Sequence, residues 1–162
     1  MAHFVCRLAE PADLPVLADL RWRLKTDDAP IADHAAYNEF VAKFVDFEMT
    51  DRTSGEVFHW VADSGGRIIA AMSVIVVRKV PEPGDLDGQW GYLTNCYALP
   101  EARNSGFGSG LLAAIKSWAI KREFELLLVW PSDRAFPFYK RAGFLRPHDP
   151  LVLDLTSGST SA

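Results

Sequence analysis

Cysteine is scarce in this sequence, and the spacings typical of metal sites are missing. Its 162 residues include two cysteines, Cys6 and Cys96, with no CxxC pair and no histidine cluster beside either of them. A structural zinc site needs about four such ligands, and small disulfide-stabilised scaffolds contain more cysteine than this. We therefore expect two reduced thiols, with Cys6 buried in a first strand, and no metal site.

Long apolar runs and an excess of positive charge are also missing. No stretch reaches the ~18 apolar residues of a membrane span, and the start MAHFVCRLAEPADL lacks the pattern of a signal peptide. With 17 Lys and Arg against 21 Asp and Glu, the formal net charge is −4, which argues against nucleic acid as a partner. We therefore expect a cytoplasmic protein with neither nucleic-acid nor membrane partners.

What remains is the composition of an ordinary globular domain. Hydrophobic residues make up 49% of the chain, which suffices to bury a core at this length. Internal repeats and linkers are not evident in the sequence. We expect one domain over residues 1–155 and a disordered polar tail, TSGSTSA, over residues 156–162.

The apolar pattern changes repeatedly between strand and helix. Helical spacing predicts helices over residues 11–24, 33–51, 107–122 and 133–143. Alternating or continuous apolar runs predict strands over residues 3–9, 57–63, 67–80, 89–99 and 125–130, with a last strand within residues 144–155. A tight turn at Gly65-Gly66 joins the second and third strands. The third strand is apolar on both faces, so we expect it at the centre of the sheet.

The helix predicted over residues 33–51 is amphipathic. Its apolar positions form one stripe, which we expect to face the core: Tyr37, Phe40, Val41, Phe44 and Phe47. Its charged positions form a flank, which we expect to face solvent: Glu39, Lys43, Asp46 and Glu48.

Three glycines stand at the start of a predicted helix, in the stretch PEARNSGFGSGLL. Gly106, Gly108 and Gly110 occur there although glycine inside a helix costs ~0.5–1 kcal/mol relative to alanine. A helix start presents unpaired N–H groups, and glycines clear side chains from these donors, so the pattern favours a phosphate cradle. The alternative is that Gly106 and Gly108 only turn the chain and pack the helix closely on the sheet. The spacing fits neither the dinucleotide fingerprint GxGxxG nor the phosphate loop GxxxxGK[ST].

Two motifs together resemble the GNAT superfamily of N-acetyltransferases. RxxGxG at residues 103–108 is similar to the superfamily's Arg/Gln-x-x-Gly-x-Gly/Ala signature, and NCYALPEARNSGFGSGLL supplies its strand–loop–helix context. AxxxYxxxGF at residues 135–144 is similar to the second signature, a helix that ends in Gly-Phe. The opening HFVCRLAEPADLPVLADLR also resembles the first strand and helix, so the resemblance covers roughly residues 3–155.

The resemblance implies a fold and a reaction. The fold is α/β (α+β), with a mixed, mostly antiparallel sheet of about six or seven strands and about four helices on its two faces. The sheet splays between the strands that end near Leu99 and Trp130. The reaction is direct transfer of acetyl from acetyl-CoA, the co-substrate, to a primary amine of a small molecule or peptide, without a metal. Family members often dimerise, so a homodimer is compatible with this resemblance.

The resemblance also implies which residues bind acetyl-CoA. Backbone N–H groups that hold the pyrophosphate come from Asn104, Ser105, Gly106, Phe107, Gly108 and Ser109. Arg103 adds charge, or else forms a salt bridge beside the helix. The strand positions that pair with the pantetheine arm are Cys96, Tyr97 and Ala98. Ser132 contacts the cofactor where many members have asparagine, and Asn104-Ser105 replaces a Gly-Lys or Gly-Arg pair.

Tyr139 stands where the superfamily has a tyrosine that assists the departing thiolate. Because a tyrosine pKa of about 10 exceeds a thiol pKa of about 8.5, we expect a hydrogen bond to the developing charge instead of full proton transfer. The alternative is an aromatic ring on the packing face of a short helix.

No general base stands out, because LLLVW has no glutamate where some members have one before Ser132. The candidates are Glu48, Asp46, His34 and His59, each of which also suits a surface position. A water relay is the alternative, and either way amines of low pKa are favoured acceptors.

Acceptor choice is expected to depend on the first two helices and on residues 81–88. Their acidic and aromatic residues suit a cationic amine, and equally describe a solvated surface: Trp22, Asp27, Asp28, Asp33 and Tyr37. The acyl group depends on the pocket around Tyr92, Phe138 and Trp130. Two rival functions are a module that binds or senses acyl-CoA without turnover and an acetyltransferase of protein N-termini or lysines.

Overall fold

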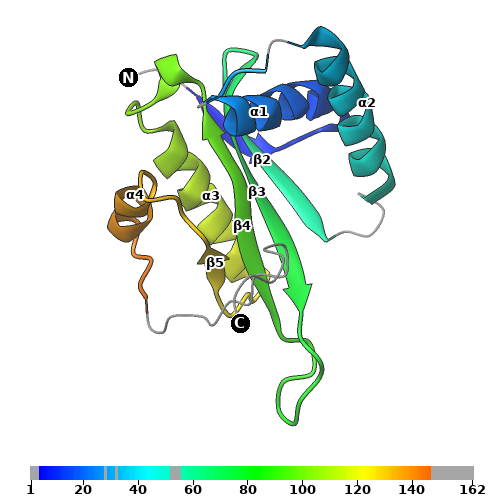
Figure 1. The fold of residues 1–162 in the computed structure, drawn as a ribbon. Coiled ribbons are helices and arrows are strands. Elements are labelled where there is room, and N and C mark those ends of the chain that lie inside the picture. Colours follow the sequence, from blue (N-terminus) through cyan, green and yellow to red (C-terminus); the bar gives the residue numbers. More distant parts are fainter. Residues whose placement is uncertain (1–3, 28, 32, 52–55, 147–162) are drawn as a thin grey trace, which may run out of the picture. The chain divides into compact units, whose positions relative to one another are not determined.

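A mixed sheet of five strands organises the first part of the chain, in the order β1-β2-β3-β4-β5 (Figure 1). The strands are β1 Val5–Leu8, β2 Val57–Ser64, β3 Arg67–Arg78, β4 Gln89–Ala98 and β5 Leu127–Val129. The first four are antiparallel neighbours, and β5 runs parallel to β4. This computed structural model describes residues 4–27, 29–31, 33–51 and 56–146.

The described residues also form four α-helices. They are α1 Leu14–Thr26, α2 His34–Asp51, α3 Phe107–Lys121 and α4 Phe136–Arg141, and short 3-10 turns precede α1 and α3 at Pro11–Asp13 and Pro100–Ala102. Residues 1–130 and 131–162 form two units, each described by itself, and α4 belongs to the second. The predicted fold class is confirmed, with five strands in the described residues against the six or seven expected.

Two predictions concern the C-terminal end of the chain. The last predicted strand, within residues 144–155, and the polar tail at 156–162 lie largely or wholly outside the described residues. A single domain over residues 1–155 stays a prediction.

The two faces of the sheet are covered by different helices. Successive side chains of a strand point to opposite faces. On β2, His59 contacts Glu48 of α2, whereas its neighbours Phe58 and Trp60 contact the ring of Trp118 in α3. Helices α2 and α3 therefore cover opposite faces, with α1 packed beside α2 (Figure 1).

The core follows the predicted pattern at β3. Residues 68–74 are buried without interruption, as expected for a strand covered on both faces. Val61, Val74 and Ile115 are completely buried in the same core. Cys6 is half-buried, so its predicted burial is wrong; β1 is an edge strand with β2 as its partner.

The apolar stripe of α2 is shifted from the prediction at its C-terminal end. Phe47 is 60% exposed, whereas Glu48 is 4% exposed. One helix face has the spacing i, i+4, i+7 and i+11, and its residues here are Tyr37, Val41, Phe44 and Glu48. Glu48 therefore takes the buried position that the apolar pattern assigns to Phe47.

Candidate functional site

The sheet opens where β4 continues past β5. The two strands pair only between Gly91–Leu93 and Leu127–Val129, and β4 continues to Ala98. Within the described parts of the chain, no strand pairs with residues 94–98 on that side. The predicted pantetheine positions, Cys96, Tyr97 and Ala98, lie on this open edge.

A β-bulge lies at the same place. Ala71 and Ser73 of β3 pair with Tyr97 and Thr94 of β4, so β4 has one residue more than β3 between these pairs. Asn95 absorbs the extra residue with a left-handed backbone, φ 52°. A bulge bends a strand and redirects its side chains, here at the point where the sheet opens. Asparagine tolerates this conformation better than most residues do. An asparagine inside a strand pattern was therefore the one feature of the sequence that could have indicated the bulge.

The loop that follows β4 ends in an uncapped helix start. Asn104 and Gly106 have positive φ values of 61° and 88°, and Gly106 is the N-cap of α3 without a side-chain cap. Neighbouring residues in such conformations turn their N–H groups toward one side, which suits an anion. The helix start also carries a partial positive charge. Asn104, Ser105 and Ser109 are exposed beside it, and Gly108 is half-buried in the first turn.

The glycines at this helix start have separate physical reasons. Gly106 supplies the left-handed turn into α3. Gly110 faces β1, because a Cβ atom there would lie 2.8 Å from the ring of Phe4 and 3.3 Å from Sγ of Cys6. Close packing against Phe4 and Cys6 therefore explains Gly110. The ring of Phe107 is buried and packs edge-on against Phe4 at 4.7 Å, so only its backbone is available to a ligand.

Arg103 links the loop to β4 and to the end of α1. Its guanidinium lies 2.7 Å from Oδ2 of Asp27 and donates to the carbonyl oxygen of Ala98 at 3.2 Å. The hydroxyl of Tyr97 donates to the same carboxylate at 2.9 Å. Burial, reinforced by the hydrogen bond to Asp27, raises the pKa of Tyr97 above its ordinary value. The predicted salt-bridge alternative for Arg103 is thus present, with Asp27 as the partner.

The second signature forms a short helix in residues 131–162. The carbonyl oxygen of Ser132 accepts from the N–H of Phe136, and α4 begins there. The ring of Tyr139 packs against Phe138 at 4.9 Å and Phe144 at 5.4 Å. Gly143 closes the helix with φ 93°. The roles of Tyr139 and Ser132 toward a ligand stay predictions.

Two of the four candidate bases are buried and bonded to each other. Oε2 of Glu48 lies 2.7 Å from Nε2 of His59, whose Nδ1 lies 2.7 Å from Oγ of Ser73. His59 and Ser73 are direct partners in the β2–β3 ladder. The surface position considered for Glu48 and His59 is therefore wrong, whereas His34 and Asp46 are exposed. Sequence reasoning missed Ser73, because only the register of two strands brings it to His59.

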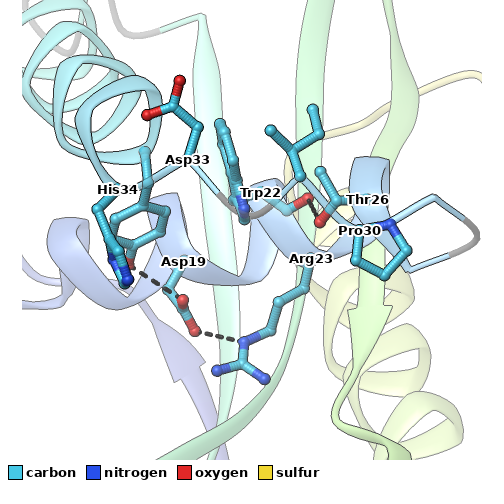
Figure 2. Close-up of a pocket in the computed structure, with 9 residues that line it drawn as sticks. Asp19, Trp22, Arg23, Thr26, Pro30, Asp33 and His34 are labelled. Carbon is cyan, nitrogen blue, oxygen red and sulfur yellow. Dashed lines mark hydrogen bonds and ion pairs between the residues drawn. The ribbon is translucent and has the colours of Figure 1, made fainter.

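A cavity of about 350 Å³ lies beside α1 and the start of α2 (Figure 2). Its wall includes four of the residues proposed for acceptor choice or catalysis, Trp22, Asp33, His34 and Tyr37. Asp19 in this wall binds Arg23 at 2.7 Å and the hydroxyl of Tyr37 at 3.1 Å (Figure 2).

The acidic groups of this region are largely engaged in local contacts. Asp33 accepts from the N–H groups of Ala35 and Ala36 and so caps α2. Asp27 binds Arg103 and Tyr97, and Asp28 lies outside the described residues. The cavity thus offers aromatic walls and partly neutralised carboxylates to a ligand.

Two further properties concern only the part of the chain that the structure describes. No helix there is long and apolar enough to cross a membrane. No three His, Cys, Asp or Glu residues gather there in a way that could hold a metal ion.

The chain is similar to acetyltransferases in sequence pattern and in fold. Residues 15–144 match the model of the acetyltransferase (GNAT) family. Among solved structures, a predicted acetyltransferase from Clostridium acetobutylicum with acetyl-CoA is 24% identical, with a TM-score of 0.74 over 94% of this chain and 97% of that one. No curated protein matches the sequence.

Two other solved structures have the same fold. A GCN5-related N-acetyltransferase from Ralstonia eutropha is 22% identical, with a TM-score of 0.74 over 94% of this chain and 99% of that one. An acetyltransferase from Trypanosoma brucei is 19% identical, with a TM-score of 0.72 over 94% and 100% of the two chains.

Proposed function

Because the chain belongs to the acetyltransferase (GNAT) family, we propose that it transfers an acetyl group from acetyl-CoA to a primary amine of a small molecule or peptide. The observation that carries this proposal is the open edge of β4 leading into the uncapped start of α3. An extended ligand arm with a phosphate end needs this combination of an unpaired strand and free helix-start amides.

The cradle residues fit the pyrophosphate of acetyl-CoA. The N–H groups of residues 104–109 would donate to its oxygens, helped by the left-handed turns at Asn104 and Gly106. Arg103 lies beside the cradle and would add positive charge, while its guanidinium also bonds to Asp27.

The pantetheine arm would then lie along the open edge of β4. Residues 96–98 have no strand partner on that side within the described chain, so their backbone groups can pair with the amides of the arm. With the pyrophosphate at α3, the arm would run from Ala98 toward Asn95, which would bring its thioester to the bulge.

Transfer itself requires three events at the thioester. The amine loses a proton, its lone pair attacks the carbonyl carbon, and the C–S bond breaks with the electron pair on sulfur. Tyr139 would stabilise the thiolate by a hydrogen bond, and Ser132 would contact the cofactor. The cavity beside α1 and α2 would admit the acceptor, and its aromatic walls favour an amine with an apolar or cationic body.

Thermal unfolding with and without acetyl-CoA tests the cradle. At about 100 times its dissociation constant the ligand adds about 2.7 kcal/mol to the free energy of unfolding, or roughly 5–10 °C in midpoint for this chain length. We expect Gly108→Glu to abolish the shift, because a carboxylate would lie against the pyrophosphate. An acidic residue in a first helical turn is itself stabilising, so the variant should fold.

Gly108→Ala is the matched control, because it adds a side chain without charge and should keep most of the shift. A wild-type protein with no shift at millimolar acetyl-CoA contradicts the proposal, and an unchanged shift in Gly108→Glu contradicts the cradle. Release of free thiol in the presence of amines separates acetyl transfer from an acyl-CoA-binding module, which would show the shift alone.

A further inference from the structure

A buried chain of three polar side chains connects α2, β2 and β3. Glu48, His59 and Ser73 are 4%, 4% and 2% exposed, and each contact between them is 2.7 Å long. A carboxylate only accepts, so Nε2 of His59 donates to Glu48, and in a neutral imidazole Nδ1 is left as an acceptor. Its Nδ1 is then the acceptor for the Ser73 hydroxyl, which donates. The hydrogen bonds therefore point from Ser73 toward Glu48, and a proton can follow the same direction.

Core packing alone does not explain this chain. A buried ionic or polar group is no more stabilising than apolar residues of similar volume, and such a replacement is often neutral or favourable. The surrounding core is apolar, with Val61 and Val74 completely buried on the same two strands. A carboxylate, an imidazole and a hydroxyl that are hydrogen-bonded one after another therefore point to proton transfer.

The Ser73 end of this hydrogen-bonded series opens on a small cavity with a mixed lining, whose apolar part comes from Leu17, Leu20, Phe44 and Ala71. Its volume is about 10 Å³, and Arg21, His59, Ser73 and Asn95 are its polar lining residues. A cavity of this size with several polar partners accommodates about one water molecule. It is too small for an acetyl group, so Ser73 is not placed to carry acetyl itself.

The cavity also adjoins the bulge of β4. Asn95 is both its lining residue and the left-handed residue of the bulge, and Ser73 pairs with Thr94 in the β3–β4 ladder. In the proposed function, on which this inference rests, the thioester of acetyl-CoA lies at this point of β4. A water in the cavity would connect the acceptor amine to Ser73.

We propose that Glu48, His59 and Ser73 form the proton relay that deprotonates the acceptor amine through one water. The ammonium gives a proton to the water, the water protonates Oγ of Ser73, and the Ser73 proton moves to Nδ1 of His59. Glu48 stabilises the imidazolium. The amine then forms the C–N bond, the C–S bond breaks, and the second amine proton goes to the thiolate. The imidazolium returns its proton through the same path to solvent.

The charged groups that face the relay come from two helices. Arg21 of α1 lines the cavity next to His59 and Ser73, and Glu48 of α2 is hydrogen-bonded to His59. Asn95 of β4 lines the cavity without a charge.

Amines of similar size and different basicity test the relay. Thiol release from acetyl-CoA is measured on the full chain with ethylamine, monofluoroethylamine and trifluoroethylamine, whose basicity falls with each fluorine. Strongly basic amines need deprotonation and weakly basic amines do not. We therefore expect Ser73→Ala and Glu48→Gln to lower kcat/KM by about 10²-fold with ethylamine, and by less than about 3-fold with trifluoroethylamine.

Controls separate this selective loss from damage to the fold. Glu48→Gln keeps the size of the side chain and an acceptor oxygen for His59, and Ser117→Ala changes an exposed serine of α3. Each variant should keep the thermal shift with acetyl-CoA. Equal losses for all three amines, or no loss, overturn the relay while leaving acetyl transfer intact. A wild-type protein that acetylates none of the three amines overturns the proposed function and the relay with it.

Discussion

The face of the sheet under α3 and the face under α1 and α2 differ in chemistry. Under α3, rings pack on rings: Trp118 contacts Phe58, Trp60 and Phe124, and Arg122 stacks over the first of these. Under α1 and α2, buried polar side chains are linked to one another by hydrogen bonds and ion pairs. The two arrangements make separate demands on the sequence, because ring packing needs volume whereas bonded chains need specific partners.

This difference assigns separate roles to the two faces. The Asp27 contacts reach Tyr97 of β4, where the sheet opens. The contacts Glu48–His59–Ser73 end on β3, at the residue that pairs with Thr94 of β4. We therefore expect substitutions under α3 to change stability alone, and substitutions that break the bonded groups under α1 and α2 to change activity as well as stability.

Trp118→Ala should give the largest loss of stability. It removes three ring contacts and the Arg122 stack at 5.2 Å, and for a half-buried ring we expect about 2–4 kcal/mol lost in the free energy of unfolding. Denaturant unfolding measures this loss. The additional stability given by acetyl-CoA should be unchanged, and its disappearance in this variant would contradict the separation of the two faces.

The features that could be predicted from the sequence are those that depend on residues close to one another along the chain. Helical and strand periodicity located the elements, and the glycine stretch located a helix start with a left-handed N-cap at Gly106. These features follow from local backbone preferences. The open edge of β4 followed from the resemblance of its motifs.

The bonded chain under α2 depends on register and could not be predicted in the same way. His59 meets Ser73 because β2 and β3 pair in one particular register, and Glu48 meets His59 because α2 crosses that position. Glu48 was assigned to a solvated flank on its charge alone. The spacing from Phe44 already placed it on the buried stripe, which is the signal that reasoning from hydrophobicity overlooked.

Glu48→Met should give the second-largest loss of stability. It leaves Nε2 of His59 buried without an acceptor, which costs about 1–3 kcal/mol. Adding His59→Leu and Ser73→Ala removes the remaining polar groups, so the triple variant should recover most of this loss. Denaturant unfolding of the single and triple variants checks the expectation. Losses that simply add would mean that the three side chains act independently in the core.

The smallest effect is expected on the other face, at the one buried side-chain nitrogen or oxygen that has no hydrogen-bond partner among the described residues. Nε1 of Trp60 is buried there and makes no hydrogen bond within the described chain. Trp60→Phe removes this unpaired donor and also some ring volume, and because the two changes oppose each other we expect less than about 1 kcal/mol. Denaturant unfolding again measures the change. A loss above about 2 kcal/mol would show that the indole N–H has a bonding partner after all, and the ring-packed face would then contain a polar contact of its own.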